Sequence, residues 1–254
     1  NNMEGKNLIL AISLSALVLI MWSIFFAPPP PTIDKEQNKI EKTQKENDIF
    51  SPSLETTKKI KAVSRVESLK TTKRISVENE SLSGSISLIG GIIDDIIFKN
   101  YNQNLNSEKK VVLLNPDGLE EGYYIETGWA STYKDVDLPN SKTEWSIVGN
   151  SKLTPNNPVT LKWTNNKQIT FLKTIKLDEN FLFKINQKIK NNGNNNYDFY
   201  PYAQIVRNKK PEVLGYYILH EGFIGVFDEE LKEEDYKDIE EKKFTANSSS
   251  GWLG

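Results

Sequence analysis

The stretch Val159–Lys190, VTLKWTNNKQITFLKTIKLDENFLFKINQKIK, decides the fold of this chain. Apolar and polar residues alternate along 159–164, 169–177 and 181–190, and a period of two is typical of β-strands with one buried face. The segments between them are rich in Asn and Asp, which favour turns because their side chains hydrogen-bond to nearby backbone. The stretch therefore predicts three strands joined by short turns.

The same alternation recurs through residues 81–254, where short apolar runs follow one another at intervals of about ten residues. Further strands are predicted at 82–88, 111–114, 123–129, 145–148, 202–206 and 214–219. Only Glu229–Lys243 shows a weak helical period. The predicted class is therefore mainly β, with a large antiparallel β-sandwich over 81–254.

A second feature, Leu8–Phe26, reads LILAISLSALVLIMWSIFF and contains 19 residues without charge, proline or glycine. At about 1.5 Å per residue, a helix of this length spans roughly 28 Å, close to the hydrocarbon thickness of a bilayer. Buried helices of soluble proteins rarely run so long without a charge. The run also exceeds the apolar core of a cleaved signal peptide, and Phe25 stands where cleavage requires a small residue. The sequence therefore predicts a retained transmembrane α-helix.

Residues 27–80 form the predicted tether between this helix and the sandwich. They contain Pro28–Pro31 and the charged run IDKEQNKIEKTQKEND, with Phe50 as the only aromatic residue. Such a segment cannot bury enough apolar surface to offset the entropy lost on ordering. Residues 1–7 precede the helix, but lysines flank it on both sides, so the charges leave its orientation open.

The composition excludes several classes of chemistry. Lys and Arg number 32 against 34 Asp and Glu, a formal net charge of −2, which argues against a nucleic-acid partner. The chain has no cysteine and one histidine, so disulfides, thiol nucleophiles and His-rich metal centres are excluded. No glycine-rich nucleotide-binding motif or nucleophile-elbow motif occurs, and no cofactor is predicted.

Two pairs of adjacent titratable residues are candidates for chemistry. His220-Glu221 places a histidine beside a carboxylate, a combination that a sugar-processing enzyme could use as acid and base. Neighbouring residues of a strand point to opposite faces, however, so a structural or surface role for His220 is the preferred interpretation. Asp94-Asp95 could begin a divalent-metal site, but no Asp-rich loop that would supply further oxygen ligands is present. No catalytic or metal-binding residue is predicted.

Aromatic residues are the remaining candidates for a binding surface. They comprise Tyr123, Tyr124, Trp129, Trp145, Trp163, Tyr200, Tyr202, Tyr216, Tyr217 and Trp252. Aromatic residues in strands mostly fill a core, and a groove for peptide or glycan is the alternative. Trp129, Tyr216 and Tyr217 are the candidate partner-binding residues.

Several segments taken together resemble the YidC family of bacterial membrane protein insertases. In order, they are GKNLILAISLSALVLIMWSIFFAPPP (5–30), SLSGSISLIGGIIDDIIFKNYNQ (81–103), VVLLNPDGLEEGYYIETGWAS (111–131), GYYILHEGFIGVFD (215–228), YKDIEEKKF (236–244) and SSSGWLG (248–254). Each segment alone is only moderately specific for this family. Their occurrence in this order behind an N-terminal membrane helix is highly specific for it. The resemblance covers the chain except for the tether, where only the composition is similar.

The resemblance implies an orientation: residues 1–7 in the cytoplasm, the helix in the bacterial inner membrane and residues 27–254 in the periplasm. It implies a mutarotase-like supersandwich for 81–254. It also implies that the whole protein has nascent inner-membrane proteins and Sec translocon components as partners, with insertase activity in further transmembrane helices. The chain would then be an anchor and a C-terminally truncated periplasmic domain without enzymatic activity, whose last strand lacks a partner.

A second hypothesis comes from another functional class. The same architecture suits a membrane-anchored periplasmic carbohydrate-binding or mutarotase-like protein, because a fold alone does not determine function.

Overall fold

The computed structural model describes residue 50 and residues 64–210, 220–227, 229–239 and 251–254, all within the compact unit Ile49–Gly254. The predicted membrane helix at 8–26, most of the tether and the predicted strand at 214–219 lie outside these described residues. Within the described ranges, no helix combines the length and the apolar character needed to cross a bilayer.

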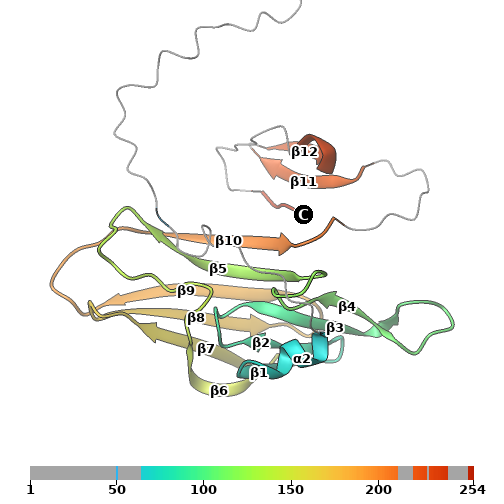
Figure 1. The fold of residues 1–254 in the computed structure, drawn as a ribbon, viewed down its shortest axis with the longest axis horizontal. Coiled ribbons are helices and arrows are strands. Elements are labelled where there is room, and N and C mark those ends of the chain that lie inside the picture. The colour runs from blue at the N-terminus through green and yellow to red at the C-terminus, as the bar shows by residue number, and fades with distance from the viewer. Residues whose placement is uncertain (1–49, 51–63, 211–219, 228, 240–250) are drawn as a thin grey trace, which may run out of the picture. The chain divides into compact units, whose positions relative to one another are not determined.

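The described residues form two sheets and two short helices (Figure 1). The large sheet and the helix before it comprise α2 (Arg65–Lys70), β1 (Arg74–Glu78), β2 (Leu82–Ser87), β3 (Ile93–Asn102), β4 (Lys110–Leu114), β5 (Tyr123–Ser131), β6 (Ser146–Thr154), β7 (Asn157–Thr164), β8 (Ile169–Leu177), β9 (Phe183–Asn191) and β10 (Phe199–Arg207). The small sheet and its helix comprise β11 (Gly222–Phe227), β12 (Glu230–Asp235) and α3 (Tyr236–Ile239).

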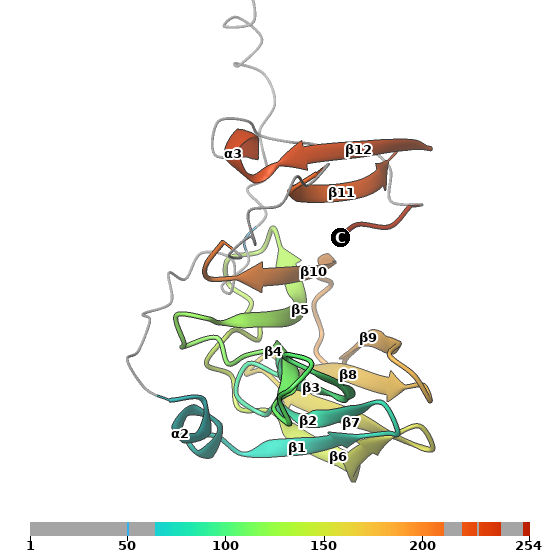
Figure 2. The ribbon, with the colours of Figure 1, turned by 90° about the vertical axis from the view of Figure 1, so that its right-hand side faces the viewer.

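The large sheet has the strand order β10-β5-β3-β2-β1-β6-β7-β8-β9, and β4 pairs with β3 outside this path. Its pairs are antiparallel except β1 with β6, which is parallel. The sheet curls so that β8 and β9 face β5 (Figure 2). Gln187 Nε2 of β9 donates a hydrogen bond to the Gly128 carbonyl oxygen of β5 at 2.7 Å, and the rings of Trp129 and Phe171 lie 5.1 Å apart. The predicted mainly β sandwich is confirmed.

The core lies between the two halves of the curled sheet. Its fully buried members come from strands far apart in the chain and include Ile75, Leu82, Ile86, Ile93, Leu153, Leu161, Ile169, Phe171 and Ile175. Trp145 stacks on Trp129 with ring centroids 6.3 Å apart, and both indoles are 2% exposed. Aromatic pairs of this kind add to the stabilisation that apolar burial gives.

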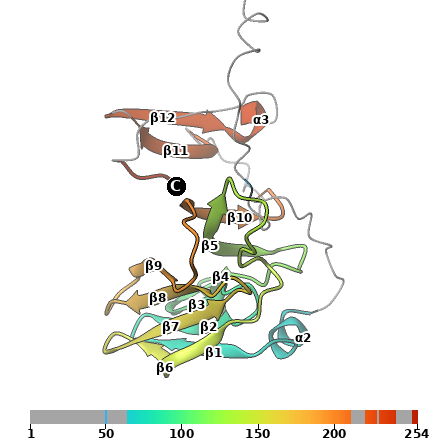
Figure 3. The ribbon, with the colours of Figure 1, turned by 90° about the vertical axis from the view of Figure 1, so that its left-hand side faces the viewer.

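The predicted strands of Val159–Lys190 are confirmed as β7, β8 and β9 (Figure 3). Their register pairs Leu161 with Lys173 on the inner face and Lys162 with Leu172 on the outer face. The first turn is closed by Asn165, whose Oδ1 accepts hydrogen bonds from the backbone N–H groups of Lys167 and Ile169 at 3.0 and 2.9 Å.

The sandwich begins before residue 81, where the sequence placed the end of the tether. Helix α2 has a complete capping box between Ser64 and Glu67, and β1 lies inside the sheet, with Ile75 0% and Val77 2% exposed. The sequence Arg-Ile-Ser-Val-Glu carries a period of two, but it is short and lies in a charged segment. The predicted end of the tether at residue 80 was therefore wrong, because α2 and β1 precede that residue.

Three other expectations also need correction. Strand β3 was not predicted, because Asp94 and Asp95 interrupt its apolar pattern. A weak helix was predicted at 229–243. The described residues of this range mostly form strand β12, and only the four residues of α3 are helical. The last residues do have a partner, since the Val226 and Ile224 N–H groups donate to the carbonyl oxygens of Trp252 and Gly254 at 2.8 and 2.9 Å.

Candidate binding groove

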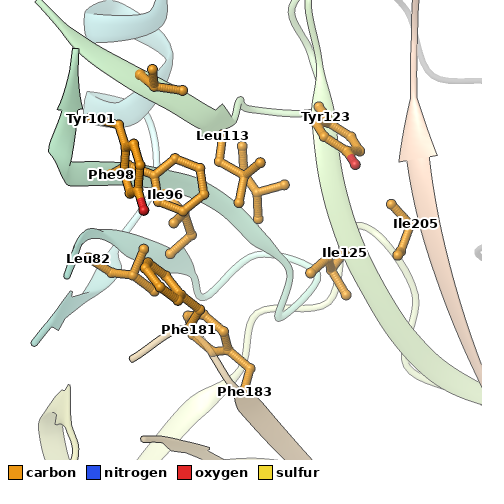
Figure 4. Close-up of a pocket in the computed structure, with 12 residues that line it drawn as sticks. Leu82, Ile96, Phe98, Tyr101, Leu113, Tyr123, Ile125, Phe181, Phe183 and Ile205 are labelled. Atoms are coloured by element: carbon orange, nitrogen blue, oxygen red, sulfur yellow. The ribbon is translucent and has the colours of Figure 1, made fainter. Parts of the chain in front are cut away.

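An apolar groove with a volume of about 490 Å³ lies among strands of the large sheet (Figure 4). Its lining residues come from six strands and one turn: Leu82, Ile96, Phe98, Tyr101, Val111, Leu113, Leu114, Tyr123, Ile125, Phe181, Phe183 and Ile205. In Figure 4, Tyr123, Ile125 and Ile205 lie on one side of the groove, and Phe98 and Tyr101 on the other.

The groove arises where neighbouring strands diverge. Strand β3 pairs with β5 only at Ile93 and Ile125, and beyond this point β3 pairs instead with β4, with two register shifts. The space between the β3–β4 pair and β5 is therefore not closed by strand pairing from Ile93–Ile125 as far as the end of β4, where two backbone hydrogen bonds of 2.8 and 3.0 Å join Asn115 to Tyr123. Side chains of both walls, and of the turn before β9, fill it only in part.

Aromatic contacts hold the walls in place. The Phe98 ring packs edge-on against Tyr101 and Phe181, with centroids 5.5 and 5.7 Å apart. On the opposite wall, the Arg207 guanidinium carbon lies 5.0 Å from the centre of the Tyr123 ring, a cation–π distance. These contacts link three strands and one turn around the same opening.

The floor of the groove is buried, whereas its rim is exposed. Leu82 and Ile96 are each 1% exposed, but Tyr101, Phe181 and Ile205 are 56, 47 and 53% exposed. Among the lining side chains, only the two tyrosine hydroxyls can form hydrogen bonds. A contiguous apolar surface of this kind is typical of a site that binds an apolar partner, since leaving it in water is unfavourable.

Of the aromatic residues that the sequence offered for a binding surface, Tyr123 lines this groove, whereas Trp129, one of the three named as partner-binding candidates, does not. Trp129 is a core residue, 2% exposed and packed against Trp145 and Phe171, so its proposed role on a binding surface was wrong. Tyr216 and Tyr217 lie outside the described residues.

His220 lies at the edge of the small sheet and makes local contacts. Its Nδ1 is 3.3 Å from Asp235 Oδ1, and its Nε2 is 3.2 Å from the Phe223 carbonyl oxygen. Both ring nitrogens therefore have partners other than Glu221, in agreement with the structural role preferred from the sequence.

Asp94 and Asp95 lie side by side in β3 and form two buried ion pairs, Asp94 with Arg74 and Asp95 with Arg65. Ser85 Oγ joins the pairs, accepting from Arg74 Nε at 2.7 Å and donating to Asp95 Oδ2 at 2.5 Å. Burial raises the pKa of Asp94 to about 6, although Arg74 opposes the change. These carboxylates are neutralised by arginine, and the described part of the chain has no group of three or more His, Cys, Asp or Glu placed to hold a metal.

One buried cation has no counterpart in the sequence-based expectations. Lys173 of β8 is 1% exposed, and its Nζ donates to the Thr127 carbonyl oxygen at 2.5 Å. The ammonium group also lies 4.8 Å from the centre of the Trp145 ring. Burial lowers the pKa of Lys173 to about 8, and the nearby Glu126 carboxylate partly opposes this.

Sequence reasoning missed the groove because its residues belong to strands that are distant in the chain. One local signal was present. Phe181 and Leu182 are apolar residues in or beside a turn, where polar residues prevail, and they are 47 and 65% exposed.

The fold and the groove define a class: a β-sandwich domain with an exposed apolar groove. Residues 74–254 match the family described as the YidC periplasmic domain. Relatives that carry the name Membrane protein insertase YidC include the following three. The one from Pelagibacter ubique is 50% identical over 99% of this chain and 45% of its own length. Those from Bradyrhizobium diazoefficiens and Rickettsia bellii are 35 and 38% identical, over 99 and 98% of this chain and 44% of each relative.

The chain belongs to the YidC family, and the resemblance seen in the sequence is confirmed. The family match begins at Arg74, the first residue of β1, which agrees with a sandwich that starts before residue 81. The chain spans less than half the length of these relatives.

Proposed function

We propose that this chain is the membrane anchor and periplasmic domain of a membrane protein insertase, and that its apolar groove holds apolar segments of client polypeptides. The groove carries the proposal, because twelve apolar or aromatic side chains line it and four of them are more than one-third exposed. The relatives named as membrane protein insertases support it, since the clients of such a protein are rich in apolar segments.

The domain arrangement is part of the proposal. Residues 1–7 lie in the cytoplasm, residues 8–26 span the inner membrane once, and the remaining residues are periplasmic, with a tether that ends at α2. Sec translocon components are proposed partners of the whole protein. A reporter enzyme that folds only in the periplasm, fused after residue 80, should be active in intact cells, and inactivity would contradict this topology.

The carbohydrate hypothesis is disfavoured by the lining of the groove. Sugar hydroxyls require several hydrogen-bonding side chains, and a pocket without them leaves those hydroxyls unpaired. The groove offers only the hydroxyls of Tyr101 and Tyr123. No enzymatic activity is therefore proposed.

The test is binding of a labelled apolar peptide, rich in Leu and Phe with a Lys at each end, to the 254-residue chain in detergent. Ile205→Asp places a charge on an exposed rim residue, so the fold is retained while burial of the peptide becomes unfavourable. We expect affinity to fall by tenfold or more, as about 1.4 kcal/mol per factor of ten requires.

The matched control is Leu105→Asp, because Leu105 is a fully exposed apolar residue that does not line the groove. This variant should bind like the unaltered chain. Equal loss in both variants would show nonspecific adsorption and contradict the proposal. Binding of glycans with no binding of the peptide would favour the carbohydrate hypothesis instead.

A further inference from the structure

Five lysines lie on the outer face of β7, β8 and β9, and we refer to them as the lysine face: Lys162, Lys176, Lys184, Lys188 and Lys190. The strand register places them on one side of the sheet. Lys162 pairs with Leu172 and Leu172 with Lys188, while Lys176 pairs with Lys184. All five are exposed, whereas most residues between them on the inner face lie in the core or pack against it.

The lysine face carries a net positive charge in a chain whose overall formal charge is −2. The other outward-facing residues of β8 and β9 are Thr170, Leu172, Thr174 and Asn186, so no carboxylate lies among them. The nearest acidic residues along the chain, Asp178 and Glu179, are in the turn between these strands.

The lysine face differs from the rest of the surface in its pairing. Within the described residues, none of its five lysines forms an ion pair, although many lysines elsewhere do so. For example, Lys152 Nζ lies 2.6 Å from Glu78 Oε2, and Lys167 Nζ lies 3.0 Å from Asp135 Oδ2. The positive charge of the face is thus left for a partner outside the described chain.

Protection of a sheet edge does not account for this pattern. Lysines on an edge strand discourage pairing with other chains, and β9 is an edge strand of the large sheet. Lys162 and Lys176, however, lie in β7 and β8, which have neighbours on both sides. Their backbone groups are already paired, so these two lysines need another explanation.

The composition of the lysine face favours a diffuse anionic surface over a protein partner. Cores of protein interfaces are enriched in Tyr, Trp and Arg and depleted in Lys, and the lysine face contains none of the enriched types. Its charges spread over about 20 Å along β9 and about 10 Å across three strands, as strand geometry requires. We propose that the lysine face binds the anionic phospholipid headgroups of the membrane surface.

This inference rests on the proposed function in one respect: the predicted span at 8–26 holds the chain beside a bilayer. Each lysine near an anionic membrane surface strengthens association by about fivefold. Removal of three lysines should therefore weaken contact with the surface by roughly a hundredfold. The contact should also weaken with salt, because headgroup attraction acts over about a Debye length.

The experiment places the 254-residue chain in liposomes of phosphatidylcholine, with or without about one-third phosphatidylglycerol. A water-soluble amine-acetylating reagent then labels the lysines, and mass spectrometry gives a rate for each. We expect labelling of the lysine face to be several-fold slower in the anionic liposomes, and the difference to vanish in about 0.5 M NaCl, where screening is nearly complete. Exposed lysines elsewhere, such as Lys73, Lys109 and Lys142, should label equally in both.

A triple variant sharpens the test. Lys162→Gln with Lys184→Gln and Lys188→Gln should return Lys176 and Lys190 to the labelling rate seen in neutral liposomes. The matched control replaces three exposed lysines elsewhere by Gln, Lys73, Lys109 and Lys142, and should leave the protection unchanged despite the same change in net charge.

The result that overturns the inference is equal labelling of the lysine face in both liposomes. Protection that requires added inner-membrane proteins would assign the face to a protein partner and would also overturn it. A chain that fails to float with neutral liposomes contradicts the anchor of the proposed function. Flotation with the anionic liposomes then decides the present inference, because binding supports it and its absence refutes it.

Discussion

Replacement of the buried Lys173 by Met tests whether burial lowers the pKa of this lysine and so makes the stability of the fold depend on pH. Its Nζ donates to the Thr127 carbonyl oxygen and faces the Trp145 ring, and the Glu126 carboxylate is the nearby opposite charge. Met has a similar length and no charge, so it fills most of the same space. The hydrogen bond is lost in the variant, at a cost of about 1–3 kcal/mol that does not depend on pH.

The pH dependence follows from the lowered pKa. In the folded chain, burial places the pKa of Lys173 at about 8, against the ordinary value of 10.5 in the unfolded chain. Below pH 8 the side chain is protonated in both states. Between pH 8 and 10.5 the unfolded state binds more protons, so the free energy of unfolding rises with pH. At about 1.4 kcal/mol per pH unit, the total gain is about 3 kcal/mol, as an order of magnitude.

The measurement is urea unfolding of the 254-residue chain from pH 7 to 10.5, followed by tryptophan fluorescence. The unaltered chain should gain about 3 kcal/mol relative to Lys173→Met across this range, because all other titrating groups cancel in the difference. Lys188→Met, an exposed lysine on the outer face of β9, is the matched control and should show no such gain. If the free energies of unfolding of the unaltered chain and of Lys173→Met changed in parallel with pH, the lowered pKa of Lys173 would be refuted.

Two further predictions concern the interior. In Asp94→Asn, the raised pKa of about 6 means that the folded state of the unaltered chain binds more protons than the unfolded state between pH 3.8 and 6. Its stability relative to the Asn variant should therefore fall by about 3 kcal/mol as pH rises through this range, and a flat difference in urea unfolding would contradict this. Gly91 has φ +61°, and an added Cβ would lie 2.9 Å from Trp145 Nε1, so Gly91→Ala should cost about 1–3 kcal/mol in thermal unfolding. Gly118→Ala, where an added Cβ meets nothing within 4 Å, should be nearly neutral, and equal losses would show that the strain is not specific.

The strands with regular alternation could be predicted because one periodic signal determined them. From Val159 to the end of β8, the inward-facing side chains of β7 and β8 are apolar and buried or, for Trp163, partly buried; the exception is Lys173, whose neighbours on the same face are Phe171 and Ile175. Strand β3 has no such signal, since the arginines that neutralise Asp94 and Asp95 come from α2 and β1. The cause of its burial is a tertiary contact, which a local pattern does not contain.

The binding surfaces escaped prediction for a different reason. Aromatic content suggested that Trp129 lies on a surface, but burial depends on which strands face each other, and the curl of the sheet encloses Trp129 between Trp145 and Phe171. The groove depends on where β3 leaves β5 after the single pair of Ile93 with Ile125. That divergence is a property of strand pairing, so composition and periodicity alone did not indicate it.

Strand β9 connects the two proposed surfaces. Phe183, at its start, lines the groove, while its neighbour Lys184 belongs to the lysine face. Because successive side chains of a strand point to opposite sides, headgroups bound to the lysine face would not occupy the groove. A client segment and the membrane surface could then be bound at the same time. Ile205→Asp should accordingly abolish peptide binding while leaving the protection of the lysine face intact, and the triple Gln variant should do the reverse. Loss of both properties in either variant would show that the two surfaces are not independent.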